Sequence, residues 1–172
     1  MSFFSFLFGS SKSTASKKQG PAPYVLKESG DSSANPGQPD LIRELESDHR
    51  ALFKLCDEIS ASFANRDLQA VADGVRQFEV LISRHLVKEN TRLYLKMERD
   101  LTDEGKRDSM RKFRMEMNQL SPVVMDFLGK YKKIAAEPEL ASTFEADFKG
   151  LGEALDDRTR REEAFLYPMY SA

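Results

Sequence analysis

Residues 40–64 read DLIRELESDHRALFKLCDEISASFA, and the apolar side chains in this stretch recur every three or four residues. That period places them along one face of an α-helix. Asp40 follows a proline and can cap the start of this helix, because its side chain accepts hydrogen bonds from unpaired backbone N–H groups. The stripe is apolar except at one position in its middle, and consists of Leu41, Leu45, His49, Leu52, Leu55 with Cys56, Ile59 and Phe63.

The same period continues in three later segments. They predict helices over residues 67–99, over residues 106–135, and from Pro138 onward. Phe165 falls on the apolar stripe of the last helix, and Pro122 inside the third should kink that helix or break it locally. No segment shows the period-two alternation of a strand. Four amphipathic helices with short connections predict an all-α, up-down-up-down four-helix bundle over residues 40–172.

Residues 1–39 have a different composition, with eight glycines and prolines among many serines. This composition predicts a flexible tail and linker. Residues 3–8 form a phenylalanine-rich cluster that precedes three lysines, the reverse of the order in a secretory signal. Two interpretations stay open for the cluster, a mobile tail and contact with a membrane surface. No apolar run in the sequence approaches the roughly 18 to 20 residues that a membrane-spanning helix needs.

Composition limits the function classes further. The chain has 172 residues and a net charge of −2, which gives no electrostatic indication of a nucleic-acid partner. Cys56 is the only cysteine, so no intrachain disulfide can form, and a reducing, cytoplasmic location is expected. Because Cys56 falls among apolar positions, we expect a small core residue there. The sequence identifies no protein partner.

Four polar residues interrupt the apolar stripes in mid-helix: His49, His85, Glu89 and Glu162. A buried, unpaired carboxylate costs several kcal/mol or takes up a proton, so these positions need a reason. His85 and Glu89 are four residues apart, which directs both toward one point. Imidazole and carboxylate together suit iron, manganese or zinc. The alternatives to a metal site are that both histidines are core residues with satisfied hydrogen bonds and that Glu162 is rotated toward solvent.

Three segments carry a family resemblance: LESDHRALF at 45–53, RHLVKEN at 84–90 and RTRREEAFLYP at 158–168. Their order on four helices resembles the hemerythrin-like (HHE) cation-binding domains, and the resemblance extends from residue 40 to the end. It implies a site of two irons bridged by carboxylates from the second and fourth helices. One iron takes histidines from the first and second helices, and the other takes them from the third and fourth.

Carried over to this chain, the resemblance implies that the first metal position is complete and the second is degenerate. His49, His85, Glu89 and Glu162 match the ligands of the first iron. The second position has Arg158 where the fourth helix should present a histidine, and the third helix has no histidine and offers Met117. We therefore expect one ion, iron or another divalent metal, rather than two. Dioxygen carriage of the hemerythrin type uses two irons, so a role in metal, oxygen or oxidant sensing or response is expected instead.

Arg158 also permits a competing outcome. Its guanidinium could fill the space of the missing ion and pair with Glu89 or Glu162, or it could extend outward to solvent. If it pairs, the carboxylates are satisfied without metal, and the bundle would be a metal-free interaction or regulatory module. A catalytic role is not expected, because the sequence has no nucleophile motif, acid–base pair or phosphate-binding glycine loop.

Overall fold

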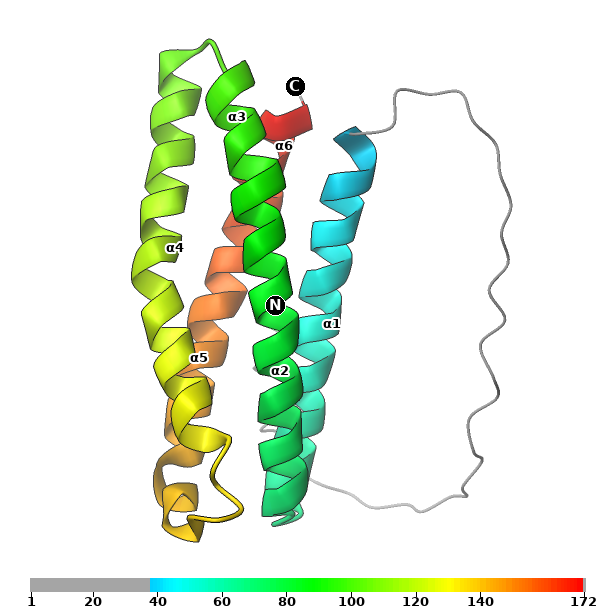
Figure 1. Cartoon of the computed structure of the whole chain (residues 1–172), viewed down its shortest axis with the longest axis vertical. Coiled ribbons are helices and arrows are strands. Elements are labelled where there is room, and N and C mark those ends of the chain that lie inside the picture. Colours follow the sequence, from blue (N-terminus) through cyan, green and yellow to red (C-terminus); the bar gives the residue numbers. More distant parts are fainter. Residues whose placement is uncertain (1–37, 172) are drawn as a thin grey trace, which may run out of the picture.

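The computed structural model of the protein describes residues 38–171, and the predictions made for residues 1–37 lie outside this range. Four long helices run alternately up and down (Figure 1). The first is α1 (Gln38–Ala64), and the second comprises α2 (Leu68–Lys88), the π-helical turn η2 (Glu89–Tyr94) and α3 (Leu95–Asp100). The third is α4 (Glu104–Tyr131), and the fourth comprises the 3₁₀ turn η3 (Pro138–Leu140), α5 (Ala141–Arg161), the π-helical turn η4 (Glu162–Leu166) and α6 (Tyr167–Ser171).

The all-α bundle predicted from the apolar periods is confirmed, with two differences in detail. The first helix starts at Gln38, two residues before the predicted cap. The helix α4 runs through Pro122 without interruption, so the predicted local break is wrong. Proline removes the hydrogen bond to the carbonyl four residues earlier, which here belongs to Asn118. Both residues are exposed, so water can satisfy that carbonyl.

Short, capped connections reverse the chain between the helices. The Asp67 side chain accepts a hydrogen bond from the Ala70 N–H at 2.9 Å, and the Asp103 side chain accepts one from the Lys106 N–H at 2.8 Å. Each satisfies a backbone donor that the first turn of a helix leaves unpaired. Arg66 adopts a left-handed conformation with φ of 58°, which tightens the turn between α1 and α2. These turns keep sequential helices adjacent and antiparallel.

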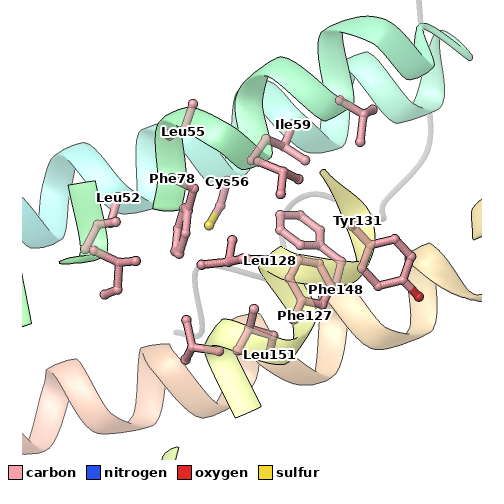
Figure 2. Packing of buried hydrophobic residues seen from close by; sticks show 14 of the residues in the cluster. Leu52, Leu55, Cys56, Ile59, Phe78, Phe127, Leu128, Tyr131, Phe148 and Leu151 are labelled. Atoms are coloured by element: carbon pink, nitrogen blue, oxygen red, sulfur yellow. The ribbon is translucent and has the colours of Figure 1, made fainter. Parts of the chain in front are cut away.

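The buried apolar side chains form two separate clusters. The larger cluster fills the end of the bundle near the α1–α2 and α4–α5 connections. Figure 2 shows Cys56, Ile59 and Phe78 from the first two helices facing Leu128 and Leu151 from the last two. The smaller cluster occupies the other end, where α6 packs against the start of α1, and it contains Leu41, Leu45, Leu93, Tyr94, Met97, Met110, Leu166, Tyr167 and Tyr170. A layer of buried polar side chains lies between the two.

The described helices also bear on membranes. Within residues 38–171, none of them combines the length and the apolar character that crossing a bilayer requires. The phenylalanine cluster at residues 3–8, for which contact with a membrane surface was one interpretation, lies outside the described residues.

Candidate metal centre

The four predicted ligands come from the first, second and fourth of the long helices. His49 comes from α1 and His85 from α2, while Glu89 and Glu162 are the first residues of η2 and η4. These four side chains are 0 to 3 % exposed, so all four predicted inward positions lie inside the bundle, and Glu162 does not turn to solvent. Their role as metal ligands remains a prediction.

The two histidines present their Nε2 atoms to the two glutamates. His49 Nε2 lies 3.4 Å from Glu162 Oε2, and His85 Nε2 lies 3.8 Å from Glu89 Oε2. The two imidazole rings are 4.7 Å apart between centroids. Candidate donor atoms of His49, His85 and Glu162 all lie within 4.8 Å of one another, close enough to hold one ion. Glu89 is not part of this group of three, although its Oε2 lies close to His85 Nε2.

The Nδ1 atom of each histidine, on the far side of the ring from Nε2, faces a second carboxylate. His49 Nδ1 lies 2.9 Å from Glu163 Oε1, and His85 Nδ1 lies 3.5 Å from Asp48 Oδ2. Lys88 holds Asp48 through a 2.8 Å contact. Carboxylates placed behind metal-binding histidines fix the ring orientation and leave Nε2 free to bind, so this arrangement suits a metal centre. Sequence reasoning missed both outer carboxylates, although each is adjacent in the chain to a predicted ligand.

Each core glutamate begins a π-helical turn, and a buried tyrosine lies five residues after each glutamate, at the end of η2 and directly after η4. The segments are ENTRLY, from Glu89 to Tyr94, and EEAFLY, from Glu162 to Tyr167, which share the pattern Glu-x-x-x-Leu-Tyr. In an α-helix the fifth residue after a glutamate is rotated about 140° away from it. A π turn closes on the fifth residue and brings that residue back to the same face. The repeated pattern was a readable signal, and sequence reasoning missed both tyrosines.

The same turn overturns one expectation about the fourth helix. Phe165 was placed on the apolar stripe, but it is 62 % exposed, and Leu166 is buried in its place. The cause is the extra residue of η4, which rotates every later side chain relative to a regular α-helix. A spacing of three from Glu162 therefore gives the exposed Phe165, whereas a spacing of four gives the buried Leu166.

Arg158 turns inward and is 3 % exposed. Its Nε donates to Glu162 Oε1, its Nη2 donates to the Tyr94 hydroxyl at 2.8 Å, and its Nη1 lies 3.3 Å from Glu116 Oε2. The guanidinium also lies over the Phe113 ring, 4.8 Å from its centroid. Of the outcomes left open by the sequence, pairing with Glu162 is the one the structure adopts, and Arg158 does not extend to solvent. Glu162 thus binds Arg158 with one oxygen and faces His49 with the other.

The pKa values of the layer describe its charge in the absence of metal. Burial would lower the pKa of His49, but hydrogen bonds to Glu162 and Glu163 outweigh burial and raise it. Burial and the nearby His49 lower the pKa of His85 to about 4. Burial and the charge of Glu162 raise the pKa of Glu89 well above its usual range. Burial opposes ionisation of Glu162, yet His49 and Arg158 lower its pKa. His85 is therefore neutral at neutral pH, Glu162 is ionised, and Glu89 tends to keep a proton.

Among the described residues, the buried Glu89 Oε2 has no hydrogen-bond partner, and the buried His85 Nδ1 has only its long 3.5 Å contact with Asp48. A cavity of about 30 Å³ adjoins them, and its wall includes all four predicted ligands together with Met117 and Arg158. A space of this size holds a water molecule or an ion. An ion would bind the unpartnered carboxylate oxygen and offset its desolvation, so the residues present fit a metal.

An antiparallel four-helix bundle with histidines and carboxylates gathered across its core belongs to a class of metal-binding bundles. The family model described as hemerythrin HHE cation binding domain matches residues 40–170. The chain therefore belongs to the hemerythrin HHE family, and the resemblance drawn from its sequence motifs is confirmed. No curated protein and no solved structure matches the chain at a significant level.

Proposed function

We propose that this protein binds one metal ion, iron in the first instance, through His49, His85, Glu89 and Glu162. The observation that carries the proposal is the buried Glu89 carboxyl, whose Oε2 lacks a hydrogen-bond partner while the Nε2 of His85 faces it. Burying a carboxyl with an unsatisfied oxygen costs free energy that only a partner can offset. Family membership supports an ion as that partner.

The number of ions follows from Arg158. Its guanidinium already pairs with Glu162 and Glu116, and Met117 beside it offers no imidazole. A second ion at that position would have no histidine ligands, and the positive charge of Arg158 would repel it. A one-ion site lacks the second iron of hemerythrin-type oxygen carriage, so we propose a role in sensing or responding to metal, oxygen or oxidants, with no catalytic step. Cys56 is buried and free, which fits the proposed cytoplasmic location.

Elemental analysis of the protein after growth with iron tests this function. We expect close to one iron per chain, and His85→Ala should remove it because the variant loses one of two imidazole ligands. Ile134→Val is the matched control, since it trims the large apolar cluster and should cost about 0.5–1.5 kcal/mol without changing the iron content. Wild-type protein that carries no more iron than the His85→Ala variant would contradict the proposal.

A second candidate function is a metal-free bundle that acts as an interaction or regulatory module. The contact between Arg158 and Glu162 favours it, because that carboxylate is neutralised without an ion. Under this alternative, removing metal with a chelator leaves the melting temperature unchanged. Under the one-ion proposal chelation lowers it, because an ion that binds only the folded state stabilises that state.

A further inference from the structure

We propose that the phenol oxygen of Tyr167 is a fifth protein donor to the ion held by His49, His85, Glu89 and Glu162. This inference rests on the proposed one-ion site and adds a ligand to it. Tyr167 is the first residue of α6, and its side chain is buried in the polar layer at 2 % exposure.

The distances around the phenol oxygen match those between donors to a common ion. The oxygen lies 3.3 Å from His49 Nε2 and 3.4 Å from Glu89 Oε1. Donors bound about 2.1 Å from one ion are separated by about 3.0 Å at right angles and about 3.4 Å in a tetrahedron. The proposed ligands His49 and Glu162 are separated by a similar 3.4 Å. Tyr167 is therefore as close to His49 and Glu89 as His49 is to Glu162.

The two contacts of the Tyr167 hydroxyl with proposed ligands are at the long end of the hydrogen-bond range. An O–H···O bond is commonly about 2.7–2.8 Å long, and both contacts of the Tyr167 hydroxyl with the proposed ligands are longer. One phenol proton can serve only one of these two atoms at full strength. The oxygen lies between His49 and Glu89, and the Tyr167 ring is stacked on that of His49 at an interplanar angle of 11°.

Tyr94, the other tyrosine of the repeated pattern, provides an internal comparison. It likewise lies five residues after the glutamate that begins a π turn, and its hydroxyl accepts a 2.8 Å hydrogen bond from Arg158. The Tyr94 oxygen thus meets the permanent cation of the layer. The Tyr167 oxygen, placed by the equivalent turn in the fourth helix, faces the side where the histidines lie. Each tyrosine oxygen is directed at one positive centre, the guanidinium in one case and the proposed ion in the other.

Coordination of the ferric ion by Tyr167 would replace the phenol proton, which is released to solvent. A phenolate bound to ferric iron gives a charge-transfer band in visible light, and excitation within that band enhances the ring vibrations of the phenolate in resonance Raman spectra. These signals arise from the tyrosine itself. They are separate from the iron content of the protein.

The test uses the full chain, loaded with iron and oxidised to the ferric state. We expect the visible band and the phenolate vibrations in the wild type. Both should be lost in Tyr167→Phe and kept in the matched variant Tyr94→Phe. Even if Tyr167→Phe folds poorly, the absence of phenolate vibrations in the iron-loaded wild type, or their loss in Tyr94→Phe, would overturn the proposal.

The outcomes separate the two proposals. Wild-type protein that binds iron but shows no phenolate vibrations, or that keeps them in Tyr167→Phe, overturns the fifth ligand and leaves the one-ion site standing. Loss of the vibrations in Tyr94→Phe instead would assign them to the wrong tyrosine and overturn it too. Wild-type protein that binds no iron overturns the site itself, and the fifth ligand with it.

Discussion

Arg158 decides the chemistry of this bundle at the scale of single residues. It is a buried, permanently charged group placed where the family resemblance expects a histidine, and it neutralises Glu162 from within the fold. Replacing it by methionine keeps the volume but leaves a buried carboxylate without its partner. Because breaking a buried ion pair by removing one member typically costs about 3–5 kcal/mol, we expect Arg158→Met to lose stability on that scale in urea unfolding of the metal-free protein.

Arg99→Ala is the control for this variant. Arg99 pairs with Asp100 on the surface, where its side chain is 74 % exposed. Removing an exposed partner should change the free energy of unfolding by less than about 1 kcal/mol. Equal losses in the two variants would mean that Arg158 contributes no more than a surface charge.

Proton competition should govern metal affinity. The pKa values of His49 and Glu89 are raised, so both tend to hold protons that an incoming ion must displace. His85, with a pKa of about 4, offers no such competition near neutral pH. Affinity should therefore increase as the pH rises, by about one logarithmic unit per pH unit for each proton displaced: up to two from His49 and Glu89, and a third where Tyr167 binds as phenolate. Titrations of metal into the apoprotein at several pH values measure this slope, and a flat profile between about pH 5 and 8 would contradict it.

Part of this site could be predicted from residue types alone. His49, His85, Glu89 and Glu162 stand out because polar residues in a bundle core require compensation. The direction of Arg158 could not be predicted, since it depends on whether Tyr94 and Glu116 are near enough to accept its hydrogen bonds. Those contacts join different helices, and helical periodicity carries no information about them.

At the scale of elements, a close approach between α1 and α2 depends on Gly74. A Cβ atom built on this residue would lie 2.6 Å from Ile59 Cγ1, whose β-branched side chain has little freedom to move. We expect Gly74→Ala to be destabilising, because overpacking of about 1–3 kcal/mol outweighs a gain of about 1 kcal/mol in helix propensity. Thermal or chemical unfolding gives the sign directly.

Gly150→Ala is the matched variant on α5. A Cβ atom there meets no atom within 4 Å, so only the gain in helix propensity applies. This variant should be more stable than the wild type by up to about 1 kcal/mol. Stabilisation of both alanine variants would contradict the close approach of α1 and α2 at Gly74.

Element boundaries show where sequence reasoning stops. The four helices followed from apolar periods of three and four, because that signal accumulates over many turns. The turns η2 and η4 could not be found in this way, since each adds one residue to a helix that otherwise continues. Phe165 was misplaced for this reason, and the shared Glu-x-x-x-Leu-Tyr pattern was the clue that remained unused.

At the scale of the whole molecule, the polar layer divides the core into a large and a small apolar cluster. The small cluster joins α6, α3 and the start of α1. When this end opens, the contacts of Glu89 and Glu162 across the layer are disrupted. The proposed ion would therefore resist such openings, whereas openings confined to the far end of the large cluster would leave its ligands in place.

Hydrogen exchange with and without metal measures this difference. At a free metal concentration of about 100 times Kd, bound metal adds about 2.7 kcal/mol to any opening that releases it, which slows exchange by up to about 100-fold. We expect this slowing in η4 and α6 and much less near Phe144 and Ile134, in the large cluster. Uniform slowing would mean that only global unfolding releases the ion.

The buried guanidinium of Arg158 also has a consequence for how the newly synthesised protein folds. An arginine is made with the polypeptide at the ribosome, whereas an ion must be acquired later from the cell's supply. Because Arg158 already neutralises Glu162, and Glu89 can hold a proton, a newly synthesised chain can close its core before any metal arrives. Folding can therefore precede metal binding, and the folded apoprotein can accumulate before it binds its ion.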